Sequence, residues 1–179
     1  MRVVLHILAE LDDGDLHWTL DAGRPLRLPR GRMLLRQGQT VEHLYLLVEG
    51  ELEMLRGGWS MGRLAPGDVL GEMELLREHG SAADVTAEAD ALALAVPHAE
   101  IRRKVLQDKG FSSRLYRALC LALADRLVRA DARNGAAGEQ GAAPDGSGEL
   151  APGTLEGLAL ARARFDWLRG RLRGARALP

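Results

Sequence analysis

The sequence predicts a compact β-barrel or jelly roll with flanking helices. Between Leu26 and Val96, short apolar or alternating runs are separated at regular intervals by turn residues. These turn residues are Gly31, Gly38, Gly50, Gly57-Gly58, Pro66-Gly67 and Gly71. From Pro97 onwards, apolar residues recur instead at the spacing of an amphipathic helix. A mainly β core followed by helices accounts for both patterns.

The first elements are a short helix and the strands. The stretch "LDDGDLHWTLDA", residues 11–22, begins with acids that can cap a helix, so Asp12 or Asp13 is the expected N-cap. The strands then occupy about residues 24–97. Among them, "LVEGELEML" places an acid-glycine turn between two apolar runs and is interpreted as a β-hairpin.

Two helices are expected between residues 97 and 130. "HAEIRRKVLQDKG" predicts the first, which Gly110 closes. The longer helix, 111–129, has two apolar stripes. They are Leu115, Leu119 and Ala122 in one and Tyr116, Cys120, Leu123 and Leu127 in the other. One stripe can pack on the barrel while the other forms a homodimer. The alternative is that both stripes belong to the core.

The C-terminal part is predicted to be a tethered helix. Residues 131–153 are rich in Gly, Ala and Pro and show no period, which is typical of a flexible linker. In residues 154–177, six arginines outnumber two acids and the apolar residues have helical spacing. These apolar residues are Leu155, Leu158, Ala161, Phe165, Leu168 and Leu172. Such a basic amphipathic helix can dock on its own domain, on a protein partner or peripherally on an anionic membrane.

Composition limits the function classes. The chain has 179 residues and is 46% apolar, enough for one domain with a core and an appendage. Its net charge of −1 provides no general attraction to nucleic acid, and the single Cys120 provides no disulfide framework. The start, "MRVVLHILAELDD", lacks the features of a signal peptide, and no segment reaches a membrane-spanning length. A cytoplasmic location is therefore expected.

No catalytic or metal site is predicted. The histidines are scattered without the close spacing of metal ligands. The serines lack a nucleophile elbow, and Cys120 is in the middle of a predicted helix. Too few residues follow that helix for a winged DNA-binding module, so no specific nucleic acid is expected as a partner.

A family resemblance rests on several spaced elements. The stretch "GEMELLREHGSAADVTA", residues 71–87, begins like a phosphate-holding loop and continues like a closing strand. With the glycine spacing, "HLYLLVEGELEML" and "APGDVLGEM", it resembles the cyclic nucleotide-binding domain family over about residues 10–130. The resemblance implies a β-roll with flanking helices. The whole chain is also similar to stand-alone bacterial members that lack a helix-turn-helix domain and are associated with bacteriocin-type export systems.

The resemblance also implies a ligand site for cAMP or cGMP, without a metal. The implied ligand-binding residues are Val69, Leu70, Gly71, Glu72, Met73, Ser81, Ala82 and Ala83. Backbone N–H groups from Gly71 to Met73 would hold the cyclic phosphate. The Glu72 carboxylate would accept a hydrogen bond from the ribose 2′-hydroxyl.

The sequence departs from the family at the phosphate-binding strand, where "SAADV" puts Ser81 in place of the usual arginine. An ionic hydrogen bond of this kind contributes roughly 1.5–3 kcal/mol, which is about one to two decades of affinity. Backbone donors and the Ser81 hydroxyl would remain. Arg77 or His79 could supply the missing charge, whereas Asp84 would repel an anion if it lined the pocket.

These observations predict a non-enzymatic regulatory module of signal transduction that binds a cyclic nucleotide, or a related small anionic ligand, weakly. The alternative is a ligand-free module that acts through protein–protein contacts, for example with an export system. A transcription regulator is the least favoured function.

Overall fold

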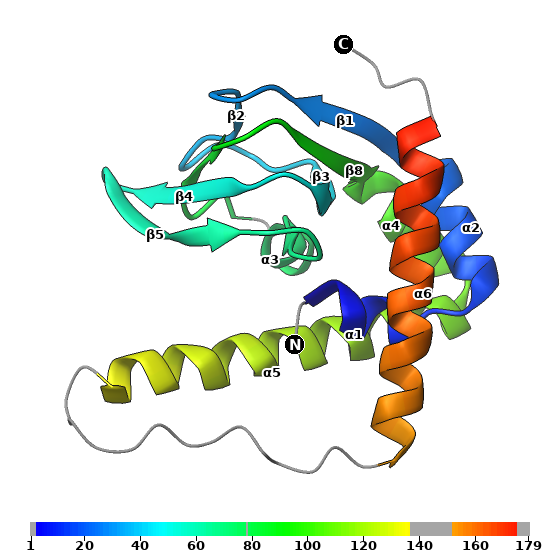
Figure 1. Cartoon of the computed structure of the whole chain (residues 1–179). Coiled ribbons are helices and arrows are strands. Elements are labelled where there is room, and N and C mark those ends of the chain that lie inside the picture. The colour runs from blue at the N-terminus through cyan, green and yellow to red at the C-terminus, as the bar shows by residue number, and fades with distance from the viewer. Residues whose placement is uncertain (1–2, 78, 137–151, 175–179) are drawn as a thin grey trace.

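A computed structural model describes residues 3–77, 79–136 and 152–174. It contains eight strands in two four-stranded antiparallel sheets, with α2, α4 and α6 at one end of the strands and α5 running below them (Figure 1). In chain order the elements are α1 (Val3–Glu10), α2 (Asp13–Ala22), β1 (Arg24–Leu28), β2 (Met33–Leu35), β3 (His43–Glu49), β4 (Leu52–Arg56), β5 (Trp59–Leu64), β6 (Val69–Leu70), α3 (Glu72–Leu76), β7 (Asp84–Ala87), β8 (Ala91–Pro97), α4 (His98–Gln107), α5 (Lys109–Ala136) and α6 (Pro152–Gly174). The predicted fold class is confirmed.

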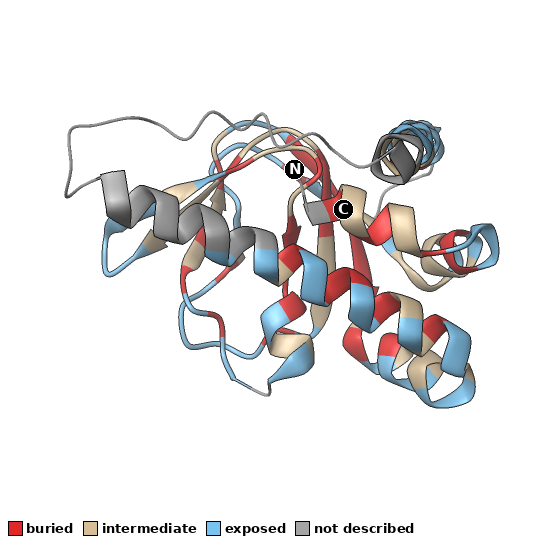
Figure 2. Cartoon of the chain, turned by 90° about the horizontal axis from the view of Figure 1, so that it is seen from below, coloured by how far each residue is buried: buried red, intermediate tan, exposed pale blue. Residues whose placement is uncertain are grey.

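The two sheets have the strand orders β1-β8-β3-β6 and β2-β7-β4-β5. Their inner faces enclose an aliphatic core that includes Leu47, Leu52 and Val85. In β7 buried and half-buried residues alternate, as expected for a strand with one face on a core. The second face of the first sheet packs against the helices, and buried residues concentrate where helices and strands meet (Figure 2).

The prediction that "LVEGELEML" forms a β-hairpin is wrong. Strand β3 pairs with β6 and β8, whereas β4 pairs with β5 and β7, so the turn between them leads from one sheet to the other. Gly50 permits this passage, because it has φ 82° and a Cβ there would lie 2.4 Å from the Asp90 carbonyl oxygen. The hairpin next along the chain joins β4 to β5.

The N-terminus of α2 is capped as predicted. The Asp12 side chain accepts a hydrogen bond from the Asp15 backbone N–H at 2.9 Å, and the Asp15 carboxylate accepts one from the Asp12 N–H at 3.1 Å. Buried Asp15 also accepts a 2.7 Å hydrogen bond from the Nε of Arg114 on α5. The capping box therefore also joins α2 to α5.

The break between α4 and α5 is at Asp108, so the predicted end of the first helix at Gly110 is wrong. Asp108 is the C-cap residue of α4. Its Oδ1 accepts a hydrogen bond from the Phe111 N–H at 2.9 Å in the first turn of α5. One aspartate thus ends one helix and caps the next, which explains why a glycine is not needed there.

The two stripes of α5 differ in exposure. Leu115, Leu119 and Ala122 are buried in the core between the helices and the first sheet. In the other stripe Tyr116 is 43% and Leu127 64% exposed. Cys120 is also exposed and Leu123 is half-buried. Packing of both stripes in the core is therefore ruled out, whereas the homodimer stays a prediction.

Helix α5 continues to Ala136, six residues into the predicted linker. Residues 137–151, which make up most of that linker, lie outside the described residues. The division of the chain into 1–130, 131–153 and 154–177 stays a prediction. None of the described helices is both long enough and apolar enough to span a bilayer.

Helix α6 packs against α1 of its own chain (Figure 1). Ala161, Leu168 and Leu172 are buried in the same core as α1 and α5. Arg164 donates hydrogen bonds to the carbonyl oxygens of Leu8 and Leu11 at 2.7 and 2.6 Å. Since carbonyls at the end of a helix lack intrahelical partners, Arg164 closes the end of α1. Of the three docking surfaces that the sequence left open, the structure therefore shows the parent domain.

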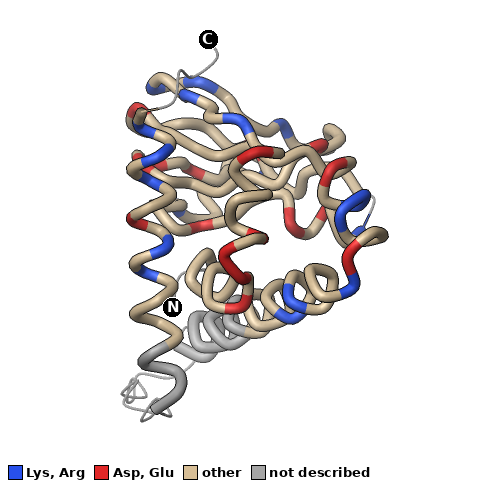
Figure 3. Tube along the Cα trace, turned by 90° about the vertical axis from the view of Figure 1, so that its right-hand side faces the viewer, with Lys and Arg blue, Asp and Glu red and all other residues tan. Residues whose placement is uncertain are grey.

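Ion pairs add to this docking. Arg164 also binds Asp13 at 2.7 Å, and Arg173 binds Glu49 at the end of β3. Basic residues follow one another along α6, as Figure 3 shows. The ring centroid of the Trp167 indole lies 5.1 Å from that of the His17 imidazole. Apolar, ionic and aromatic contacts thus all join α6 to the first two helices.

Candidate functional site beside Gly71

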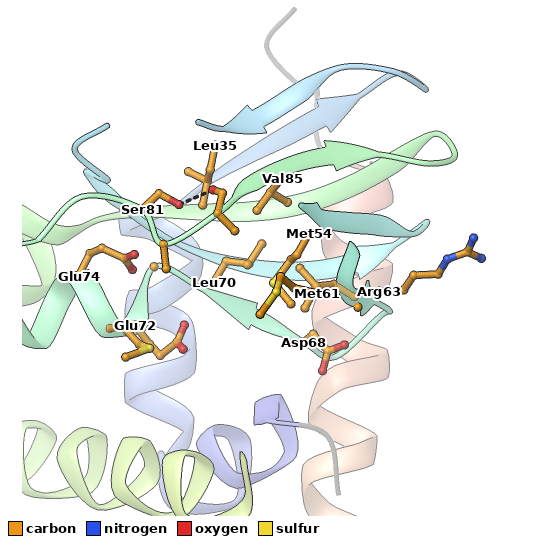
Figure 4. A pocket seen from close by; sticks show the side chains of 16 residues that line it. Leu35, Met54, Met61, Arg63, Asp68, Leu70, Glu72, Glu74, Ser81 and Val85 are labelled. Carbon is orange, nitrogen blue, oxygen red and sulfur yellow. Dashed lines mark hydrogen bonds between the residues drawn. The ribbon is translucent and has the colours of Figure 1, made fainter. Parts of the chain in front are cut away.

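A cavity of about 360 Å³ opens between helix α3 and the sheet β2-β7-β4-β5 (Figure 4). This volume is within the range of roughly 300–1,000 Å³ that small-molecule pockets occupy. Seven of the eight predicted ligand-binding residues line it: Leu70, Gly71, Glu72, Met73, Ser81, Ala82 and Ala83. The eighth, Val69, is buried in the helix-side core instead. Leu35, Met54 and Val85, which sequence reasoning did not identify, form part of its apolar wall.

Gly71 shapes the entrance to α3. It has φ 82° and ψ 2°, and a Cβ at this position would lie 2.2 Å from the carbonyl oxygen of His43. Only glycine meets both conditions without strain. As N-cap of α3, Gly71 places no capping side chain over the first-turn N–H groups, which lie beside the cavity.

The α3 side of the cavity carries acids. Glu72 is only 2% exposed and Glu74 is half-buried, and Asp68, whose Oδ2 accepts a 2.8 Å hydrogen bond from the Ala65 N–H, lines the cavity away from α3 (Figure 4). Figure 4 shows both glutamates on α3 with Ser81 on the opposite side. Glu72 is thus placed where a ribose hydroxyl could donate to it, but three carboxylates also make the cavity unfavourable for an anion.

Ser81 does not replace the missing arginine. It is 6% exposed, and its Oγ donates a 2.8 Å hydrogen bond to the carbonyl oxygen of Ala83 (Figure 4). Because a hydroxyl has a single proton, this bond leaves none for a phosphate. The prediction that the Ser81 hydroxyl donates to the phosphate is therefore wrong.

No other described cation takes over that role. Among the described residues Arg63 is the only basic one that lines the cavity, and its guanidinium binds Glu51 at 3.6 Å and Glu88 at 3.2 Å, pointing away from the cavity in Figure 4. Arg77 and His79 are exposed and do not line it. Neither of these two side chains therefore supplies the missing positive charge.

Asp84 does not contribute to the acidity of the cavity. Its Oδ1 accepts a 2.8 Å hydrogen bond from the Gln37 backbone N–H, and the residue is not part of the cavity lining. The acids that can repel an anion here are therefore Glu72, Glu74 and Asp68, and not Asp84. In the described residues no group of three or more His, Cys, Asp or Glu is suited to a metal ion.

Comparison with known families decides what kind of domain this is. A sequence model described as a cyclic nucleotide-binding domain matches residues 25–108. This part of the chain belongs to the cyclic nucleotide-binding domain family. The match includes all eight strands except the first residue of β1.

Among curated relatives, the chain is 35% identical over 104 residues to glutaminase 1 of Bradyrhizobium diazoefficiens, which is 58% of this chain and 17% of that protein. The chain spans only 9% and 17% of the two curated relatives that it matches. The catabolite activator protein of Thermus thermophilus has a TM-score of 0.62 at 22% identity, over 97% of this chain and 91% of that one. The regulatory domain of Toxoplasma gondii PKA, crystallised with cAMP, has a TM-score of 0.50 at 26% identity, over 56% and 42%.

A buried histidine lies behind the Gly71 turn. His98, the first residue of α4, is 3% exposed, and its backbone N–H donates to the Glu42 carbonyl oxygen at 2.8 Å. Burial of the imidazole, followed by the nearby charge of Arg102, lowers the pKa of His98 below its usual value of 6.5. The folded protein therefore holds this side chain neutral at pH values where the unfolded chain protonates it.

We expect acid to destabilise the protein through His98. Below about pH 6.5 the unfolded state binds a proton that the folded state excludes, so the free energy of unfolding falls as the pH is lowered from there toward the folded pKa. His98→Gln should have a flatter profile than the wild type in urea denaturation between neutral and mildly acidic pH. His79→Gln, at an exposed position, is the control. Parallel profiles for His98→Gln and wild type would contradict this assignment.

Proposed function

We propose that the chain is a regulatory module, without a catalytic role of its own, whose cavity beside Gly71 binds a cyclic nucleotide or a related small anionic ligand weakly. The observation that supports this is the Gly71–Glu72 turn, which keeps backbone donors and a buried carboxylate at one cavity while Ser81 binds Ala83 instead of a phosphate. The first two nucleotides to test are cAMP and cGMP. The T. gondii PKA domain was crystallised with cAMP, and one curated relative is a cGMP-dependent protein kinase.

Ser81→Arg is expected to tighten the binding of cAMP or cGMP by about one to two decades. The substitution would add a charge-assisted hydrogen bond to the phosphate, a contribution of roughly 1.5–3 kcal/mol. Calorimetric titration of the wild type and the variant with each nucleotide measures the change. Ser60→Arg is the control, because it adds the same charge at an exposed position on β5 outside the cavity lining.

Two results would count against weak binding at this site. One is tight binding by the wild type that Ser81→Arg leaves unchanged, since the missing arginine would then have no consequence. The other is an equal gain from Ser60→Arg, which would mean that the general charge of the protein, and not a contact in the cavity, governs affinity.

A ligand-free module is the second candidate function. The three carboxylates that line the cavity, with no described cation facing it, favour this alternative because they repel a phosphate. In that case the domain would act through its surface, for which the exposed stripe of α5 is available. Absence of binding heat for cAMP and cGMP in both the wild type and Ser81→Arg would favour this function over the first.

We also propose that the exposed stripe of α5 forms a homodimer. Tyr116 and Leu127 would be shielded from water by a second copy of the chain, and apolar positions at this spacing suit helix pairing. Leu123→Glu should then give a soluble monomer by light scattering. Leu121→Glu, an equal change at a 39% exposed leucine outside the stripe, should stay dimeric. A wild type that is monomeric at high concentration would exclude the dimer.

A further inference from the structure

The cavity beside Gly71 presents hydrogen-bond acceptors to a ligand, and its described side chains offer it no donor. Three carboxylates line the cavity, and an ionised carboxylate can only accept. The one hydroxyl in the lining, that of Ser81, already donates its proton to a backbone carbonyl. The guanidinium of Arg63 binds Glu51 and Glu88 and points away from the cavity (Figure 4). Recognition by these side chains therefore requires a ligand that brings the donors itself.

Two of the carboxylates lie on different sides of the cavity. Glu74 is half-buried, and its side chain extends from α3 toward the cavity (Figure 4). Asp68 is also half-buried and lines the cavity away from α3. A ligand between them therefore meets negative charge from two directions, and Glu74 is within its reach as an acceptor.

Helix α3 does not make the cavity favourable for an anion. The helix has only five residues, and its first turn carries Glu72 and Glu74. Acids at this position already compensate the partial positive charge of a helix N-terminus. A phosphate placed beside them adds like charge at short range, which is unfavourable. The field of the described side chains thus opposes a phosphate at this wall.

The rest of the wall is apolar and includes two thioethers that suit an aromatic ring. Met54 and Met61 line the cavity together with Leu35, Leu70 and Val85 (Figure 4). Thioether sulfur makes favourable contacts with aromatic rings, and the aliphatic side chains remove a ring from water. The volume of about 360 Å³ is near the lower end of the range for small-molecule sites, roughly 300–1,000 Å³. A single base with its sugar is a ligand of suitable size and chemistry.

We propose that this cavity binds an uncharged nucleoside more tightly than the corresponding cyclic nucleotide. The inference rests on the proposed function, because it keeps the same cavity as the site and a base with its ribose as the ligand. A nucleoside has hydroxyls at the 2′, 3′ and 5′ positions, and each can donate to a carboxylate such as that of Glu74. In a 3′,5′-cyclic nucleotide the 3′ and 5′ hydroxyls are esterified, and the ester carries a negative charge. The loss of donors and the added charge both disfavour the cyclic nucleotide at an acidic wall.

Calorimetric titration of the full chain with adenosine, guanosine, cAMP and cGMP tests the proposal. At least one nucleoside should bind about tenfold or more tightly than its own cyclic nucleotide. Raising the salt concentration from about 0.01 M to about 1 M shortens the Debye length from about 30 Å to about 3 Å. The cyclic nucleotide should then bind more tightly, because its repulsion by the carboxylates is screened, whereas the affinity for the nucleoside should hardly change.

Glu74→Gln should shift the two ligands in opposite directions. Loss of the charge should weaken nucleoside binding by about fivefold to tenfold, because a charge-assisted hydrogen bond becomes a neutral one. The same loss should strengthen binding of the cyclic nucleotide. Glu53→Gln, an equal change on β4 outside the cavity lining, should leave both affinities unchanged. A general loss of stability would weaken both ligands together, so it does not imitate this result.

The outcomes separate this inference from the proposed function. Cyclic nucleotides that both bind more tightly than their nucleosides would overturn the inference and leave the proposed function in place. Cyclic nucleotide binding that weakens as salt is added would also overturn it, because a cation would then hold the phosphate. Absence of binding by all four compounds would overturn both. Equal responses of the nucleoside to Glu74→Gln and Glu53→Gln would exclude this cavity as its site.

Discussion

Replacing Leu168 with alanine is expected to lower the free energy of unfolding by about 2–5 kcal/mol. Leu168 lies on α6 and has no exposed surface. It packs in the core that α1 and α5 share with the first sheet. Since that core is closed around the side chain, its truncation leaves a cavity that the neighbouring residues cannot fill. Urea denaturation followed by circular dichroism measures the loss.

Leu160 provides the matched control, because the same substitution is made on the same helix at a side chain that is 48% exposed. Leu160→Ala should change the free energy of unfolding by less than about 0.5 kcal/mol. Truncation after Arg133 removes α6 altogether and should have a larger effect than either substitution. It should lower the melting temperature and expose the apolar face of α1 to a reporter dye. Equal effects of Leu160→Ala and Leu168→Ala would mean that α6 does not contribute to the core. Binding of a protein partner by α6 stays a prediction, and these experiments do not depend on it.

The periodicity of the sequence was sufficient for the strands but not for how they pair. Turn residues recur between Leu26 and Val96, and β1 begins at Arg24 while β8 ends at Pro97, close to the predicted limits. The turn at Gly50 was misassigned because an acid-glycine turn between apolar runs looks the same whether the next strand returns to its neighbour or enters another sheet. The pairing of β4 with β7 distinguishes them, and it joins residues far apart in the sequence.

Helix α1 was missed for a different reason. Val4, Ile7 and Leu8 in its sequence, VVLHILAE, have the i, i+3, i+4 spacing of an amphipathic helix, but the helix is only eight residues long. These three side chains are buried where α1 packs against α5 and α6. The tail helix repeats such a spacing over more turns and was recognised. Its partner could not be identified because docking depends on Arg164 reaching carbonyls more than a hundred residues earlier.

The site was only partly accessible to sequence reasoning. The resemblance placed Gly71 and Glu72 together with Ser81, and the structure brings all three to one cavity. The hydroxyl proton of Ser81 was not predictable, since its acceptor is a backbone carbonyl two residues away. His98 carried no signal beyond its place after Pro97. A buried imidazole becomes visible only when the elements that cover it are in position.

Gly71→Ala is expected to destabilise the protein strongly and to abolish nucleotide binding. An alanine at φ 82° costs about 1–2 kcal/mol from the left-handed backbone alone. In addition, its Cβ would lie 2.2 Å from the His43 carbonyl oxygen, so β3 and α3 must move apart. Forcing extra volume into a packed contact costs a further ~1–3 kcal/mol. The first amides of α3 move with the turn, which removes the backbone donors from the phosphate position.

Gly31→Ala separates these two costs. Gly31 has φ 83°, nearly the same as Gly71, but a Cβ there would meet no atom within 4 Å. In urea denaturation, Gly31→Ala should therefore lower the free energy of unfolding only by the cost of the left-handed backbone. Gly71→Ala should lower it by that cost and by the cost of the close contact. The difference between the two variants measures the close approach of the Gly71 turn to β3. Equal losses would mean that β3 yields without cost and that Gly71 is required only for its dihedral angle. The rigid turn proposed for the phosphate site would then have no support from packing.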